Sequence, residues 1–99
     1  MNLTVVITRD VEDRYRGFLA SAMLEAAAGV YVSKALTPRS RDKVWAVVAD
    51  WHAALGRGSL TLLYADSSCD GGIAVRTLGE PTRRPVSVDG AVLMLRVST

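Results

Sequence analysis

The sequence predicts an α+β fold in which two helices cover one face of an antiparallel or mixed sheet and a C-terminal hairpin is left over. Two segments carry apolar residues at helical spacing, several short runs are rich in β-branched residues, and two turn sequences contain adjacent Asp and Gly. At 99 residues the chain has room for one domain, and a hydrophobic fraction of 49% excludes a disordered protein.

The first half of the chain is predicted to alternate strands and helices. A β-branched run at residues 3–8 predicts a buried first strand. Residues 14–27 carry apolar side chains at helical spacing and many alanines, which predicts a helix that ends at Gly29. A brief second strand follows at residues 30–32.

The second helix is marked at both ends. Thr37 is placed as its N-cap, Pro38 as its first residue and Gly56 just beyond its last. Trp45 and His52 are predicted to lie beside its apolar stripe. The stripe itself consists of Val44, Val47, Val48, Trp51 and Leu55.

The remainder of the chain predicts four strands. Residues 70–72 form the turn between the first two, and residues 89–90 are an Asp-Gly hairpin turn. The last strand is apolar on both faces, which is typical either of a central strand or of one that pairs with a partner's sheet. The four strands span residues 60–65, 73–78, 86–88 and 91–97.

The strand count between the helices leaves two arrangements open. A βαββαβ order needs two strands there, but only residues 30–32 form a clear one. Either a further short strand lies at residues 34–36, or the fold is a variant.

Composition narrows the functional class. The single cysteine, Cys69, predicts a reducing cytoplasm, and the start of the chain predicts a strand rather than a signal peptide. No stretch approaches the roughly 18 consecutive apolar residues of a membrane span. One histidine and one cysteine cannot build an ordinary zinc site, and no Gly-rich phosphate loop is present.

The apolar content exceeds the needs of one small core, which predicts a homodimer.

Arginine dominates the basic residues, with ten arginines against two lysines and a net charge of +2. One pair of arginines falls in the first turn of each predicted helix, and a third pair precedes the last two strands. A helix N-terminus attracts anions, so cations there indicate a bound phosphate unless neighbouring acidic residues neutralise them. The candidate phosphate ligands are Arg14, Arg16, Arg39, Arg41, Arg83 and Arg84.

Asp10 follows the first predicted strand, where a loop often carries functional residues. Two copies of its carboxylate across a dimer axis would offer oxygen ligands to a hard cation such as Mg²⁺. Alternatively, Asp10 caps the N-terminus of the first helix.

Several short motifs, taken in order, resemble the second of the two universal CRISPR-associated adaptation proteins, in its type I-E branch. The resemblance covers essentially the whole chain, and its specificity lies in the order and spacing of the motifs. These motifs are residues 5–11 (VVITRDV), 14–20 (RYRGFLA), 24–25 (LE), 28–32 (AGVYV), 77–79 (TLG), 83–84 (RR) and 86–90 (VSVDG), with Trp45.

The resemblance implies a ferredoxin-like βαββαβ homodimer with an additional C-terminal β-hairpin. Such a dimer lies between two dimers of the partner integrase, binds double-stranded DNA by its backbone and serves spacer acquisition. The family pattern places Arg14, Arg16, Arg39 and the late pair of arginines on the DNA. Residues 1–85 would form the ferredoxin-like domain. Residues 86–99 would swap between subunits and dock the integrase, through Val86, Val88, Val92, Leu93, Met94, Leu95 and Val97.

The resemblance also implies an alternative function, a Mg²⁺-dependent endonuclease acting on RNA or DNA. It rests on an acidic residue that closes the first strand. In this chain Arg9 stands at that position and Asp10 comes one residue later. Because a cation repels another cation, Arg9 argues against a metal site there, while Asp10 stays the candidate catalytic and metal-binding residue.

Overall fold

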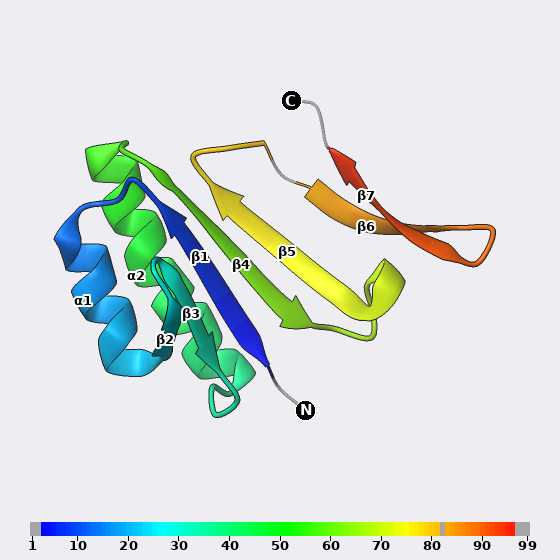
Figure 1. The fold of residues 1–99 in the computed structure, drawn as a ribbon, viewed down its shortest axis with the longest axis horizontal. Coiled ribbons are helices and arrows are strands. Elements are labelled where there is room, and N and C mark those ends of the chain that lie inside the picture. Colours follow the sequence, from blue (N-terminus) through cyan, green and yellow to red (C-terminus); the bar gives the residue numbers. More distant parts are fainter. Residues whose placement is uncertain (1–2, 82, 97–99) are drawn as a thin grey trace.

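The computed structural model describes residues 3–81 and 83–96, which form a five-stranded antiparallel sheet, two helices and a separate hairpin (Figure 1). The sheet has the order β2-β3-β1-β4-β5, so its first four strands follow the βαββαβ ferredoxin-like arrangement. The predicted α+β class is confirmed. The elements are β1 (Thr4–Arg9), α1 (Asp13–Ala22), β2 (Leu24–Ala27), β3 (Val30–Ser33), α2 (Pro38–Leu55), β4 (Ser59–Ala65), the 3₁₀ turn η1 (Asp70–Gly72), β5 (Ile73–Leu78), β6 (Arg83–Val88) and β7 (Ala91–Arg96).

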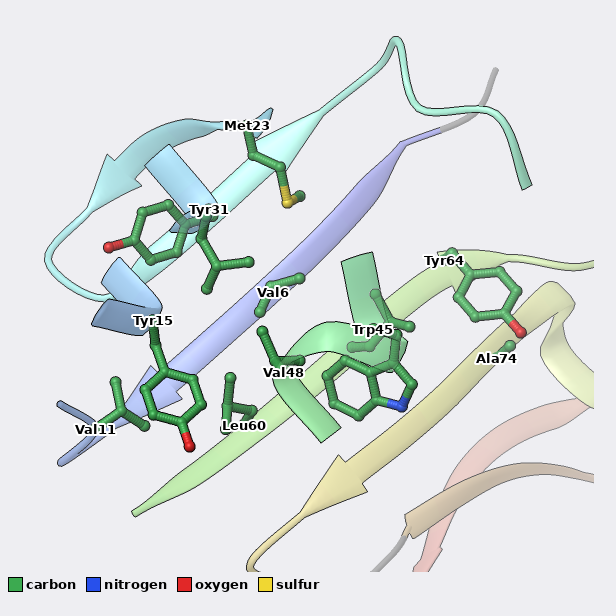
Figure 2. Close-up of a cluster of buried hydrophobic side chains, with 12 residues drawn as sticks. Val6, Val11, Tyr15, Met23, Tyr31, Trp45, Val48, Leu60, Tyr64 and Ala74 are labelled. Carbon is green, nitrogen blue, oxygen red and sulfur yellow. The ribbon is translucent and has the colours of Figure 1, made fainter. Parts of the chain in front are cut away.

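The core lies between the helices and one face of the sheet. Alternate residues of β1 and β4 point into it, as Thr4 and Val6 do on β1, while Val5 and Ile7 point to the other face. Figure 2 shows Val6 and Val48 facing each other across this layer, with Leu60 beside them. Among the described residues, the opposite face of the sheet carries no helix (Figure 1).

The strand missing from the sequence prediction is β2, Leu24–Ala27. It lies in the segment predicted to be the end of the first helix, and α1 stops at Ala22. Of the two alternatives that the sequence left open, the strand at residues 34–36 is wrong. Leucine and alanine favour a helix locally, but pairing with β3 decides the conformation.

Gly29 closes the β2–β3 hairpin instead of ending a helix. Its φ of 76° is readily accessible only to glycine, and its carbonyl accepts a hydrogen bond from the Thr8 amide at 2.7 Å. The turn is therefore tied directly to β1.

The buried face of α2 is rotated from the predicted stripe. Trp45 is only 9% exposed and Val48 is fully buried, whereas Leu55 is 45% exposed. The prediction that Trp45 lies beside the stripe is wrong. Residues 45 and 48 are three apart and share one helix face, and that face is the one turned toward β4 and β5 (Figure 2).

The N-terminus of α2 is capped as predicted. The Thr37 side chain accepts a hydrogen bond from the Ser40 amide at 3.1 Å, and Pro38 occupies the first turn. Replacing Thr37 by alanine is expected to lower the free energy of unfolding by about 1 kcal/mol, because the Ser40 amide loses its acceptor. Urea denaturation measures this, and Thr37→Ser, which keeps the hydroxyl, is the matched control. Equal stability of the two variants would contradict the cap.

The C-terminal hairpin forms a sheet of its own, and its turn at residues 89–90 is the predicted one. It lies over η1, where a Cβ added to Gly71 would come within 2.6 Å of the Val92 side chain. Several large apolar side chains of the hairpin are about half exposed: Val88, Val92, Leu93, Met94 and Leu95. Val97 lies outside the described residues.

Candidate nucleic-acid interface

Arg14 is held on the outer surface of the helix layer by an aromatic cluster. Its guanidinium carbon lies 5.3 Å from the centre of the Trp51 ring, which in turn packs edge-on against Tyr15 and Phe18. A guanidinium stacked on an aromatic face keeps its N–H groups available at the edge. Arg14 is exposed and is therefore positioned to bind an anion.

Arg16 points away from Arg14, toward β2 and β3. It lies 3.8 Å from the Glu25 carboxylate, and half of its side chain is exposed. The Tyr31 hydroxyl and Glu25 both raise the pKa of Arg16. Residues two apart on a helix do not face the same way, which explains why the two arginines separate.

Arg39 and Arg41 begin α2 and differ in availability. Arg39 is exposed, but the Arg41 guanidinium lies 3.6 Å from the centre of the Tyr64 ring and bonds to Asp42 at 3.2 Å. Only 15% of the Arg41 side chain is exposed. Arg41 therefore has a structural role that the sequence prediction did not foresee.

Arg76 joins the same cluster from β5. It lies 3.5 Å from Asp42 and 5.6 Å from the centre of the Tyr64 ring. The sequence analysis missed it because it stands alone in a strand, and only the pairing of β5 with β4 brings it to this helix end.

The two pairs of arginines lie at opposite ends of the helix layer. Helices α1 and α2 run antiparallel (Figure 1), so the start of α1 lies beside the end of α2. An 18-residue helix such as α2 is about 27 Å long. Phosphates along one DNA strand are spaced about 3.4 Å along the helix axis, so the length of α2 corresponds to roughly eight base-pair steps.

The third pair of arginines, Arg83 and Arg84, lies on the hairpin. Arg84 is exposed on β6, while the side chain of Arg83 lies outside the described part of the chain. These residues belong to the separate β6–β7 sheet and not to the helix layer.

Asp10 binds an arginine and does not cap α1. Its Oδ1 accepts a hydrogen bond from Nη2 of Arg57 at 3.1 Å, and its φ of 54° lies in the left-handed region. The N-cap of α1 is Glu12, whose side chain makes no capping bond. The prediction of a cap at Asp10 is wrong, because the chain makes a turn between β1 and α1 that leaves Asp10 outside the helix.

One copy of the chain offers too few ligands around Asp10 to hold a metal ion by itself. Within residues 3–81 and 83–96, no three His, Cys, Asp or Glu side chains are grouped so that they would hold a metal. Mg²⁺ needs a near-octahedral set of oxygen ligands. The described contact of Asp10 is instead a guanidinium.

Within the part of the chain that the structure describes, two buried polar atoms near this end of α1 have no hydrogen-bond partner, Oε1 of Glu12 and the Tyr15 hydroxyl. Burial raises the pKa of the Tyr15 phenol, and the Glu12 carboxylate raises it further. Both atoms are thus kept from water in the free protein.

A protein-family profile described as CRISPR-associated protein (Cas_Cas2CT1978) matches residues 3–93. The chain belongs to this CRISPR-associated family. The match runs from the residue before β1 into β7, so it includes the sheet, both helices and the turn of the hairpin.

Within this CRISPR-associated protein, the described helices are not of the kind that cross a membrane: none is both long and apolar enough. The longest helix, α2, carries charged residues along its length.

Proposed function

We propose that this CRISPR-associated protein is a DNA-binding scaffold for spacer acquisition. A homodimer binds the backbone of a DNA duplex and bridges two dimers of the partner integrase. The observation that carries the proposal is the placement of exposed guanidinium groups, Arg14 and Arg39, at the two ends of one helix layer. This spacing suits a long, regular polyanion better than a small ligand.

The uncovered face of the sheet supports a homodimer. It is largely apolar and only half-buried, and β1, β3 and β5 contribute Ile7, Val32 and Val75 to it. A hollow of about 250 Å³ on this face is also lined by Met94 of the hairpin. Exposed apolar surface is stabilised when a second subunit covers it.

The proposed binding is electrostatic. Arginines that contact phosphates release counterions, which makes affinity fall steeply with salt but conveys little sequence information. The integrase would carry out the strand-transfer chemistry, and this chain would bind the DNA and position it.

The test is duplex binding across a salt series, with Mg²⁺ present, for the wild type and Arg14→Ala/Arg16→Ala. Each lost phosphate contact is expected to reduce the slope of log affinity against log salt by about 0.9, so a dimer that loses both arginines from both subunits should lose about 3.6. Arg14→Lys/Arg16→Lys keeps both charges and should keep most of the slope. An unchanged slope in the alanine variant would remove these residues from the interface.

A denaturing gel of the same samples tests the endonuclease alternative. The scaffold predicts intact DNA in Mg²⁺. Cleavage that a chelator abolishes would favour the nuclease instead.

A further inference from the structure

We infer that Arg57, and not a metal ion, neutralises the charge of Asp10, and that this ion pair holds the α2–β4 loop against the end of β1. The family resemblance would place a metal ion at this position. The inference concerns the free protein and does not depend on DNA binding. Asp10 is then a positioning residue and not a metal ligand.

The contact joins segments far apart in sequence. Nη2 of Arg57 donates to Oδ1 of Asp10 at 3.1 Å across a separation of 47 residues. The hydrogen bond to Asp10 is the largest influence on Arg57 and raises its pKa. An arginine guanidinium carries its charge at every pH at which a carboxylate is ionised.

The backbone prepares this contact. Gly58, the residue after Arg57, packs so closely on the end of β1 that an added Cβ would overlap the carbonyl oxygens of Arg9 and Asp10. On the other side, the Gly58 carbonyl lies 3.0 Å from Nε2 of His52. Both contacts hold the backbone of the loop, so only the Arg57 side chain has to become ordered to reach Asp10.

The surrounding charges favour a guanidinium in this place. Glu12 and Asp13 also raise the pKa of Arg57, which shows that its charge lies in the field of three carboxylates. Mg²⁺ would have to displace Arg57 and find several oxygen ligands at about 2.1 Å. A guanidinium neutralises the strand-end carboxylate through hydrogen bonds and needs no such ligand set.

The pair is tested without DNA by a double-mutant cycle. Asp10→Asn retains a residue that tolerates a positive φ, and Arg57→Gln removes the charge. Each is expected to speed amide hydrogen exchange in the loop at residues 57–59 by about two- to fivefold, the range for an exposed ion pair. The double variant should exchange no faster than either single variant, because both remove the same contact. Arg57→Lys should restore part of the protection.

The competing metal site is tested with Mn²⁺ by electron paramagnetic resonance, as a probe for Mg²⁺. The wild type and Asp10→Asn are expected to bind Mn²⁺ equally weakly. Stoichiometric binding that Asp10→Asn abolishes would overturn the inference, and so would additive effects of the two single variants on exchange. None of these readouts changes if the DNA-binding proposal fails, so the two proposals are separable.

Discussion

Replacing Gly58 by alanine is expected to destabilise the protein by about 3 kcal/mol, the sum of a strained backbone and an overpacked contact. Gly58 has a φ of 77°, and its Cα lies against the carbonyl groups of Arg9 and Asp10. Because backbone atoms cannot rotate away as a side chain can, the end of β1 would have to move. Gly79→Ala should cost a similar amount: its φ is 82°, and its added Cβ would overlap the Gly58 carbonyl and lie 2.9 Å from Nε2 of His52.

Two other glycines separate the two causes. Gly56 has a φ of 65° but open space around its Cα, so Gly56→Ala should show only the conformational cost of about 1 kcal/mol. Gly17 lies within α1 in open space, so Gly17→Ala should stabilise by about 0.5–1 kcal/mol. Chemical denaturation of the four variants measures the series. If Gly58→Ala matched Gly56→Ala, the close approach of the loop to β1 would be contradicted.

Replacing Leu93 and Leu95 by lysine is expected to weaken assembly of the proposed dimer roughly hundredfold. These residues alternate with Val92 and Met94, which lie toward η1 and the open sheet face, so they occupy the other face of β7. In the hairpin swap between subunits that the family resemblance implies, this second face would pack on the partner subunit in addition to the open sheet face. Both are about half exposed in the single chain. Burying two leucines in an interface is worth about 3 kcal/mol or more, and two lysines would abolish that gain.

Light scattering across a concentration series measures this effect. Ala46→Lys/Ala54→Lys adds the same charges at exposed positions of α2 and should leave assembly unchanged. The far-ultraviolet circular dichroism of Leu93→Lys/Leu95→Lys should match that of the wild type, because the hairpin is a sheet separate from the main one. A dimer of unchanged stability would exclude this face of β7 from the interface.

The sequence predicted where many residues of the candidate site lie, because they stand at the starts of helices, but it did not predict the roles of these residues. The positions of Arg14, Arg16, Arg39 and Arg41 at the two helix N-termini were predicted correctly. Their directions were not predictable, because each direction depends on a ring or carboxylate from another element. The Arg41 guanidinium, for example, stacks on the Tyr64 ring and is therefore not among the exposed arginines.

The family assignment came from motifs in order along the chain, and the profile match over residues 3–93 confirmed it. Neither the sequence motifs nor the family profile predicted the Asp10–Arg57 contact. Arg57 stood outside every arginine cluster in the sequence, and a strand-end aspartate alone suggests a cap or a metal.

The sequence by itself determined the features that depend on neighbours along the chain: the α2 cap at Thr37, the hairpin turn at residues 89–90 and the α+β class. Only the tertiary structure decided β2, the burial of Trp45 and the pairing of Asp10 with Arg57. Local propensity and periodicity act over a few residues, whereas these three depend on contacts with distant segments. A strand of Leu and Ala exists because β3 supplies its hydrogen bonds, and Asp10 meets a guanidinium because Gly58 lets a loop 47 residues away approach it.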